Sequence, residues 1–169
     1  MRTVARSIFL VLGLLLVTTT CFARQDRPYV VFDVPGATST HPVSINNNGD
    51  VTGWYSTIDG NKRGFVREFD GTLTTFDGVP TNINDAGAIT GYLSVSNWPP
   101  YPSLVGFVRD QDGKITLFEI KRKETSYAAY ITFGSAINNQ GEIAGFFLDD
   151  SMSDLPHGFI RDRQGSMTF

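Results

Sequence analysis

A ten-residue phrase recurs three times along this chain and constrains its fold more than any other feature. The three copies read INNNGDVTGW, INDAGAITGY and INNQGEIAGF, and they begin at Ile45, Ile83 and Ile137. A shorter phrase of the form Gly-Phe-Val/Ile-Arg-Glu/Asp follows each copy, beginning at Gly64, Gly106 and Gly158. Repetition on this scale is typical of one supersecondary unit that stacks on copies of itself. The sequence therefore predicts a repeat architecture.

Within each repeat, apolar residues alternate with polar or small ones, and β-branched and aromatic types are common, as in residues 51–55 and 73–76. This alternation predicts strands, and no segment shows a sustained helical period. Each repeat contains four such segments, and four-stranded antiparallel units in series are the pattern of propeller blades. We predict an all-β fold of β-propeller-like units, three in number, at about 38–77, 78–119 and 120–169, with a leading strand at 29–34.

The Asn-x-x-Gly segments predict tight turns, because Asn can bond its own backbone and Gly supplies a positive φ. A residue that is present in every repeat usually serves the scaffold. We assign this structural role to the repeated arginines Arg67, Arg109 and Arg161. The same role is predicted for Asn46, Gly49, Gly53, Asn84, Gly87, Gly91, Asn138, Gly141, Gly145, Phe65, Phe107 and Phe159.

Some spacings in the repeat are fixed and others vary. The turn glycines Gly71, Gly113 and Gly165 always lie seven residues after the glycine that opens the second phrase. The connections between the two phrases, and between one repeat and the next, differ in length. Successive connections of an up-and-down sheet lie on alternate edges, so the invariant turns share one edge and the variable connections share the other. Insertions in repeat proteins collect on one face, which is often the binding face.

The first 23 residues have the pattern of a secretion signal. Arg2 and Arg6 precede an apolar run at 8–17, and Cys21-Phe22-Ala23 resembles a cleavage site. The run has ten residues, whereas a membrane-spanning helix needs roughly 20. We predict a signal peptide at 1–23 and a secreted β-repeat domain at 24–169, extracellular, periplasmic or at the cell surface, without a stable membrane span. A retained anchor and a lipoprotein attached through Cys21 are the alternatives.

Composition limits the partners of the mature domain. Removing residues 1–23 takes away two of the 14 basic residues and none of the 17 acidic ones, which leaves a net charge of −5. A negative balance disfavours nucleic acid and anionic membranes as partners. The single cysteine, Cys21, lies in the signal, so the exported domain contains no disulfide. Its stability must come from packing and strand pairing.

The phrase Ile-Asn-x-x-Gly-x-Ile-x-Gly followed by a His-x-Phe-type strand resembles the HAF family of bacterial extracellular repeats. His157-Gly158-Phe159 is the nearest match to the tripeptide that names the family, whereas Arg63-Gly64-Phe65 and Val105-Gly106-Phe107 depart from it at the first position. All three copies carry Gly where the family usually has Ala. The resemblance covers nearly all of 29–169, and it implies a propeller-like fold and an extracellular location. It implies no catalytic residues.

Closed propellers have about four to eight blades, whereas three repeats and one leading strand are visible here. The last strand also stops early, because Phe169 aligns with the residue before Phe76 and Phe118. We expect a truncated or divergent array, or a chain that completes itself by pairing with another chain. An open end exposes a strand edge, which favours self-association.

No hydrolytic or phosphate-binding motif is present in the sequence. His41 and His157 are the only histidines, and His157 occupies the repeat's own histidine position, which favours packing. The acidic residues Asp149, Asp150 and Asp154 could form the acid and base of a glycosidase-like hydrolase or lyase on extracellular polysaccharide. An exposed acidic loop is usually only solvated. We therefore predict no catalytic residues, no metal site and no cofactor, with the enzyme as the alternative.

Two insertions that are not repeated carry aromatic residues on the variable edge. We predict ligand-binding roles for Trp98, Tyr101, Tyr127 and Tyr130. Aromatic rings on proline-stiffened loops are suited to stacking on sugars or peptides at low entropic cost. The alternative is that these rings cap the core. The sequence thus predicts a secreted, non-enzymatic protein that is structural or binds a glycan or a peptide.

Overall fold

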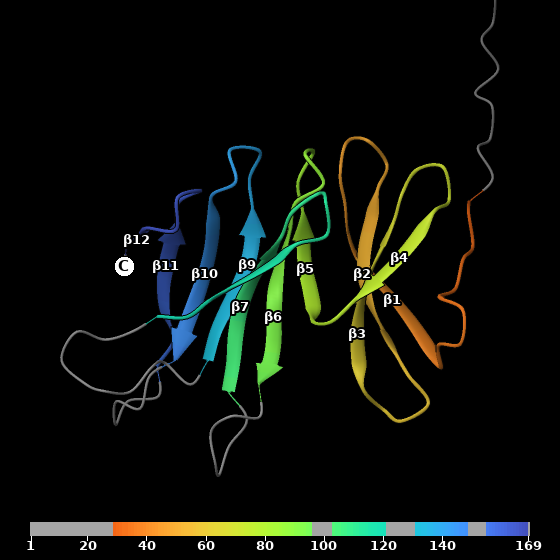
Figure 1. Cartoon of the computed structure of the whole chain (residues 1–169), viewed down its shortest axis with the longest axis horizontal. Helices are drawn as coiled ribbons and strands as arrows, with labels where there is room; N and C mark the ends of the chain where they lie inside the picture. The colour runs from red at the N-terminus through yellow and green to blue at the C-terminus, as the bar shows by residue number, and fades with distance from the viewer. Residues whose placement is uncertain (1–28, 96–102, 121–130, 149–154, 169) are drawn as a thin grey trace, which may run out of the picture. The chain divides into compact units, whose positions relative to one another are not determined.

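The computed structural model describes residues 29–95, 103–120, 131–148 and 155–168 (Figure 1). The chain divides into two compact parts, 1–31 and 32–169, and the described strands all belong to the second part. None of the described residues lies in a helix, so this portion of the chain offers no helix that could cross a membrane. The prediction of an all-β fold is confirmed.

The described strands form three consecutive four-stranded repeats. The first repeat contains β1 (Ser39–Ile45), β2 (Val51–Ser56), β3 (Lys62–Arg67) and β4 (Leu73–Phe76). The second contains β5 (Val79–Ile83), β6 (Ile89–Val95), β7 (Ser103–Arg109) and β8 (Ile115–Phe118). The third contains β9 (Ile131–Ile137), β10 (Ile143–Leu148), β11 (His157–Arg161) and β12 (Met167–Thr168). Within each repeat, neighbouring strands pair antiparallel in chain order.

The three repeats are distributed over two sheets. The first repeat forms a sheet of its own, whereas the second and third are joined into one eight-stranded sheet. The junction is a single parallel pair between Leu104 of β7 and Ile131 of β9. β8 pairs only with residues 106–109 of β7, which leaves the beginning of β7 free to meet β9. The described strands do not close into a ring, so the propeller-like arrangement remains a proposal.

The first strand of every repeat carries a β-bulge. The pairing of β1 with β2 skips Val43, that of β5 with β6 skips Thr81, and that of β9 with β10 skips Ser135. A bulge leaves one residue unpaired and increases the local twist of the strand. Our strand prediction did not include it, because the residues at these positions have no common type.

Three core clusters lie at equivalent places along the repeats. The cluster shared by the first and second repeats contains Val66, Phe76, Ile83, Ile89 and Phe107. The cluster shared by the second and third contains Phe118, Ile120, Ile137, Ile143, Phe147 and Phe159. The cluster at the beginning contains Val34, Tyr55 and Phe65, with Phe32 packed against it. The core therefore lies between repeats rather than inside them, as in stacked repeat proteins.

One aromatic pair recurs in each cluster. The phenylalanine that ends one repeat meets the phenylalanine of the next repeat's third strand edge to face, with ring centroids 6.1 Å apart for Phe76 and Phe107 and 6.0 Å for Phe118 and Phe159. Edge-to-face pairs at this separation add to the energy of burial. Phe65, Phe107 and Phe159 are all buried in these clusters.

The predicted leading strand at 29–34 is wrong, because these residues carry no strand. Phe32 instead makes an edge-to-face contact with Phe65 at 5.8 Å, in the place that Phe76 and Phe118 occupy in the later repeats. Val34 is buried, and its backbone N–H donates to the side-chain hydroxyl of Thr40 in β1 rather than to a strand backbone. A strand needs a partner strand, and none of the described strands pairs with this segment.

Candidate functional site

The predicted ligand-binding residues Trp98, Tyr101, Tyr127 and Tyr130 lie outside the described residues, as do Asp149, Asp150 and Asp154. Their roles therefore stay predictions. The described residues show whether the invariant turns share one edge of the sheet, as the sequence predicts. The Asp50 carboxylate accepts a hydrogen bond from the backbone N–H of Phe69 at 3.1 Å, so the two invariant turns of the first repeat lie side by side. The Asn-x-x-Gly turns occupy the upper edge in Figure 1, whereas the described β2–β3 turn lies at the lower edge.

The Asn-x-x-Gly turns have the predicted geometry. In the first repeat, Gly49 N–H donates to the Asn46 carbonyl at 3.1 Å, and the φ of Gly49 is 88°. Gly87 and Gly141 repeat this bond and this conformation. The side-chain oxygen of Asn46 accepts the backbone N–H groups of Asn48 and Asp50 at 3.0 and 2.9 Å. The asparagine thus holds its own turn, as expected for this residue type.

The same asparagines also connect neighbouring repeats, and we refer to Asn46, Asn84 and Asn138 as the asparagine ladder. The side-chain amide of Asn46 donates to the Asn84 carbonyl at 3.1 Å. The amide of Asn84 donates in turn to the Asn138 carbonyl at 2.8 Å. Asn46 and Asn84 therefore each stabilise their own turn through the side-chain oxygen and contact the next repeat through the side-chain nitrogen.

A second polar row runs beside the ladder, through Asn47, Asp85 and Asn139. Asp85 accepts from the backbone N–H and the side-chain amide of Asn47, both at 2.9 Å. It also accepts from the amide of Asn139 at 2.8 Å, while its own backbone N–H donates to the Asn139 side-chain oxygen at 3.0 Å. The bonds from Asn47, followed by that from Asn139, lower the pKa of the Asp85 carboxyl. This carboxylate is therefore held in the charged form.

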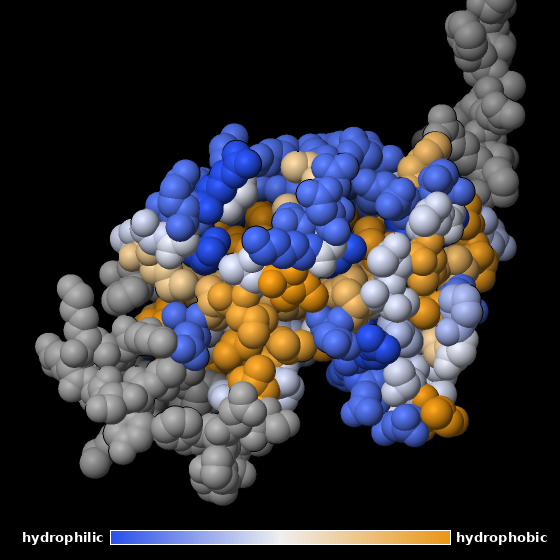
Figure 2. Space-filling view, in the orientation of Figure 1, coloured by the Kyte–Doolittle hydropathy of each residue, from blue (hydrophilic) through white to orange (hydrophobic). Residues whose placement is uncertain are grey.

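These two rows line an open pocket of about 460 Å³, which we name the asparagine pocket. Its lining comprises Ile45, Asn46, Asn47, Ile83, Asn84, Asp85, Ile137, Asn138, Asn139 and Gln140. Asp85 is the single charged residue among them. All three repeats contribute to the pocket, and hydrophilic residues gather along the same edge in Figure 2. Hydrogen-bond donors and acceptors are thus presented around short apolar surfaces.

The chemistry of the pocket suits binding. Amides both donate and accept hydrogen bonds, and an ionised carboxylate accepts only. An acid that delivers a proton near neutral pH needs a raised pKa, whereas that of Asp85 is lowered. Among the described residues, no group of three or more His, Cys, Asp or Glu side chains is placed to hold a metal ion. The pocket can therefore hold a polar ligand by hydrogen bonds.

The repeated arginines lie at the contacts between repeats. The guanidinium carbons of Arg109 and Arg161 lie 5.1 Å from the ring centres of Phe76 and Phe118, and that of Arg67 lies 5.2 Å from Phe32. Such cation–π contacts stabilise a packed cation. Burial lowers the pKa of the Arg109 guanidinium, although the carboxylates of Asp110 and Glu68 oppose the shift. These contacts support the structural role predicted for the three arginines.

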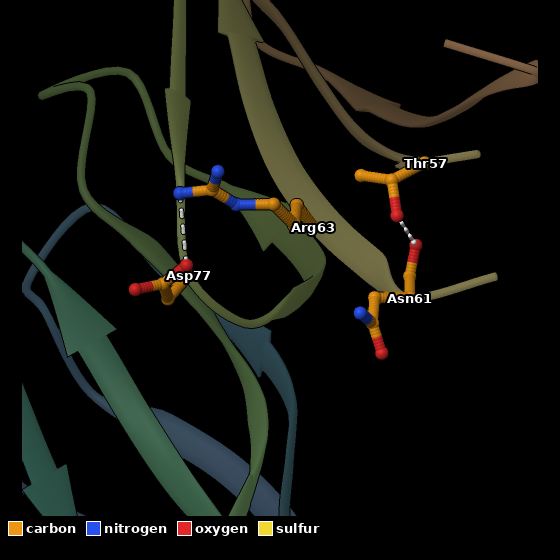
Figure 3. Close-up of polar contacts among 4 residues, drawn as sticks. All are labelled: Thr57, Asn61, Arg63 and Asp77. Carbon is orange, nitrogen blue, oxygen red and sulfur yellow. Dashed lines mark hydrogen bonds and ion pairs between the residues drawn. The ribbon is translucent and has the colours of Figure 1, made fainter. Parts of the chain in front are cut away.

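At the opposite edge, polar and aromatic contacts fix the first repeat. Arg63 forms an ion pair with Asp77 at 2.9 Å, and Thr57 donates to the Asn61 carbonyl in the β2–β3 turn (Figure 3). His41 stacks on Trp54 with ring centroids 3.9 Å apart, and the Lys62 ammonium lies 4.1 Å from the Trp54 ring centre. The Trp54 ring is therefore already engaged by its own repeat.

Sequence reasoning missed Asn47, Asp85, Asn139 and Gln140 as residues of a site. It treated everything inside the repeated phrase as scaffold and searched only the insertions. A usable signal was present, because the position after the ladder asparagine is Asn, Asp and Asn in the three copies. A turn that served only the backbone would have no need of a polar residue there.

The fold and the pocket define this chain as a tandem array of four-stranded antiparallel repeats that share a polar pocket along their turns. No family model matches the chain, and neither a curated protein nor a solved structure matches it.

Proposed function

We propose that this protein is an exported, non-enzymatic binding module of the HAF-repeat type, which holds a neutral polyhydroxylated ligand, such as a glycan, in the asparagine pocket. The observation that carries the proposal is the polar row of Asn47, Asp85 and Asn139 beside exposed Gln140. Ligand sites combine an apolar surface with a few convergent polar groups that fix orientation. Ile45, which is 66% exposed, supplies most of the apolar surface here.

The charge of the pocket favours a neutral ligand. The Asp85 carboxylate would repel phosphate, sulfate or carboxylate groups, because no cationic residue lines the pocket to offset it. Sugar hydroxyls can donate to Asp85 and can also accept from side-chain amides. A peptide offers the same groups more sparsely, and it is the alternative ligand that the experiment below distinguishes.

A propeller-like arrangement supports this location of the site. Four-stranded blades of a propeller surround a central channel, and their inner strands line it. β1, β5 and β9 all end at the asparagine pocket, which is the arrangement expected of inner strands. The predicted signal at 1–23 would deliver the module to the outside of the cell, where glycans are abundant.

The test is isothermal titration calorimetry of the protein with neutral, acidic and basic oligosaccharides and with short peptides. We expect a neutral oligosaccharide to bind, and we expect Gln140→Ala to weaken binding several-fold. No side-chain hydrogen bond holds Gln140 among the described residues, so this change leaves the turn intact. Gln111→Ala is the matched control, because Gln111 is also exposed but does not line the pocket.

Two results would contradict the proposal. One is the absence of binding by every neutral sugar in the panel, and the other is unchanged affinity in Gln140→Ala. If only peptides bind, and Gln140→Ala weakens that binding, the asparagine pocket is the binding site but its ligand is a peptide and not a glycan. Binding that is lost in Trp98→Ala but kept in Gln140→Ala would move the site to the variable edge.

A further inference from the structure

The two ends of the repeat array carry the two halves of an interface that the chain already uses twice. Val66 of the first repeat packs in one cluster with Ile83 and Ile89 of the second. At the equivalent places between the second and third repeats, Val108 packs against the cluster that contains Ile137 and Ile143. One half of this contact is thus a valine on the third strand, and the other half is a pair of isoleucines on the first two strands.

At the ends of the array, the third-strand position and one of the two isoleucine positions are exposed, whereas Val51, the first repeat's equivalent of Ile89 and Ile143, packs against the cluster of Val34, Tyr55 and Phe65. Ile160 is the third repeat's equivalent of Val66 and Val108, and it is 57% exposed. Ile45 is the first repeat's equivalent of Ile83 and Ile137, and it is 66% exposed, whereas those two are 5% and 7% exposed. Large apolar side chains that are buried at two of three equivalent positions indicate a contact that is missing at the third.

Small residues accompany these apolar ones. Where the second and third repeats meet, Gly134 packs directly on Thr90, because a Cβ built at Gly134 would overlap the Thr90 hydroxyl. Strand pairing makes Ala144 the counterpart of Thr90 in the third repeat and Pro42 the counterpart of Gly134 in the first. Ala144 and Pro42 are both exposed. Both end faces therefore carry exposed small side chains at the positions that are in contact between the second and third repeats.

The asparagine ladder also has two unused ends. The amide of Asn46 makes two bonds, to the Asp50 carboxylate and to the Asn84 carbonyl. The amide of Asn138 makes the first kind of bond, to Glu142 at 2.7 Å, and within the described residues it makes no bond of the second kind. An amide nitrogen has two hydrogens and a carbonyl has two lone pairs. One hydrogen on Asn138 and one lone pair on the Asn46 carbonyl are left to continue the ladder.

We infer that the third repeat of one copy docks on the first repeat of a second copy of this chain, and that it reproduces the interface between consecutive repeats. Ile160 of one copy then packs on Ile45 of the other, and the Asn138 amide donates to the Asn46 carbonyl across the junction. Ile45, Asn46 and Asn138 also line the asparagine pocket, but the inference rests on the contacts between repeats and not on the proposed ligand. The contact is between sheet faces, which differs from the pairing of open strand edges that the sequence predicts.

The interface is head to tail, because it joins two different surfaces, and such interfaces either close into a ring or continue as a filament. The smallest ring contains two copies, and their six described repeats fall within the range of about four to eight blades that closed propellers have. We therefore expect a closed dimer.

One internal contact cannot form at the junction, and it offers a gain-of-function test. The backbone N–H of Ile137 donates to the side chain of Asn82 at 3.0 Å, and that of Ile83 contacts the Ser44 hydroxyl at 3.4 Å. The third repeat has Ala136 at this position, which offers no acceptor to Ile45. Ala136→Asn should therefore strengthen the association several-fold.

Sedimentation of the full chain over roughly 1 to 200 µM measures the association directly. We expect a dimer in the wild type and a monomer in both Ile45→Asp and Ile160→Asp. Because both positions are exposed within one copy, each variant should unfold at the temperature of the wild type diluted below its dissociation constant. An equimolar mixture of the two variants should form a one-to-one heterodimer, since each retains one intact face. Leu117→Asp is the control, because Leu117 is 49% exposed but belongs to the middle repeat.

Three results would overturn the inference. A wild-type monomer throughout this range would mean that a second copy is not the occupant of these faces. A dimer that survives one of the two substitutions would mean that like faces pair, as in an isologous dimer. A Leu117→Asp variant that dissociates as readily as Ile160→Asp would mean that the association is not specific to the end faces.

Discussion

The second and third repeats share a sequence pattern but differ in what surrounds them. The second is covered on both faces, whereas the third has one face against the second repeat and one face exposed. Thr90 is fully buried, and its counterpart Ala144 is exposed. Asn84 is 5% exposed, and its counterpart Asn138 is exposed. The energetic weight of a repeated residue is therefore set by its neighbouring repeats.

The two repeats also differ in the type of residue at matched places. Asp85 and Asn139 occupy one position, and only Asp85 carries a charge, which lies between the amides of Asn47 and Asn139. Asn82 and Ala136 occupy another, and only Asn82 bridges its neighbours, donating to Ser44 and accepting from Ile137. The middle repeat thus carries the groups that serve both sides, as expected where stability is a sum of nearest-neighbour interfaces.

The largest effect that we expect comes from filling the same glycine position in each repeat. A Cβ at Gly106 would overlap the Phe118 ring, which is packed against Phe159, whereas a Cβ at Gly158 would meet only the Gly145 carbonyl oxygen at 4.0 Å among the described residues. Gly106→Ala should lower the free energy of unfolding by about 2 to 3 kcal/mol through overpacking. Gly158→Ala should raise it by about 0.5 kcal/mol, because Gly weakens a strand relative to Ala. Urea unfolding measures the change in free energy in each variant. Equal changes in the two variants would contradict the predicted difference between the second and third repeats.

A smaller effect is expected at the asparagine ladder. Asn84→Ala removes the acceptor of the Ala88 N–H and the donor to the Asn138 carbonyl, so it should cost about 2 kcal/mol of unfolding free energy. Asn138→Ala removes bonds only within its own exposed turn and should cost about 1 kcal/mol. Chemical denaturation of both variants, with circular dichroism of the native state as the control, tests the difference. A larger loss in Asn138→Ala would contradict our account of the ladder.

Much of this fold can be predicted from the sequence because the repeat supplies three samples of one pattern. The strands that end at Ile45, Ile83 and Ile137, and the turns at Gly49, Gly87 and Gly141, follow from alternation and turn chemistry alone. The expected leading strand fails for a physical reason. Residues 29–34 have strand-forming side chains. A strand also needs a second segment to pair with, and the sequence of one segment does not show whether such a partner lies beside it.

The site could be predicted less well than the fold. Asn47, Asp85 and Asn139 lie far apart in the chain, and they meet only because the turns of consecutive repeats stack. The bulges at Val43, Thr81 and Ser135 likewise depend on pairing between strands, which no local pattern records. The sequence predicts a scaffold role for the ladder asparagines, and the same residues also line the pocket.

The smallest effect that we expect is a pH dependence at the polar row, because Asp85 is exposed and exposed charges contribute little. The folded-state pKa of Asp85 is lowered, so its contribution to stability is complete above about pH 4, the unfolded value, and is lost as the pH falls through the folded value. Asp85→Asn should therefore flatten the acid limb of stability. Asn139→Asp should lower stability near neutrality and make it rise as the pH falls, because two facing carboxylates repel each other and protonation relieves the repulsion. Urea unfolding between roughly pH 3 and 7 at low salt measures both slopes, and identical slopes in the two variants would show that Asp85 and Asn139 do not act as a pair.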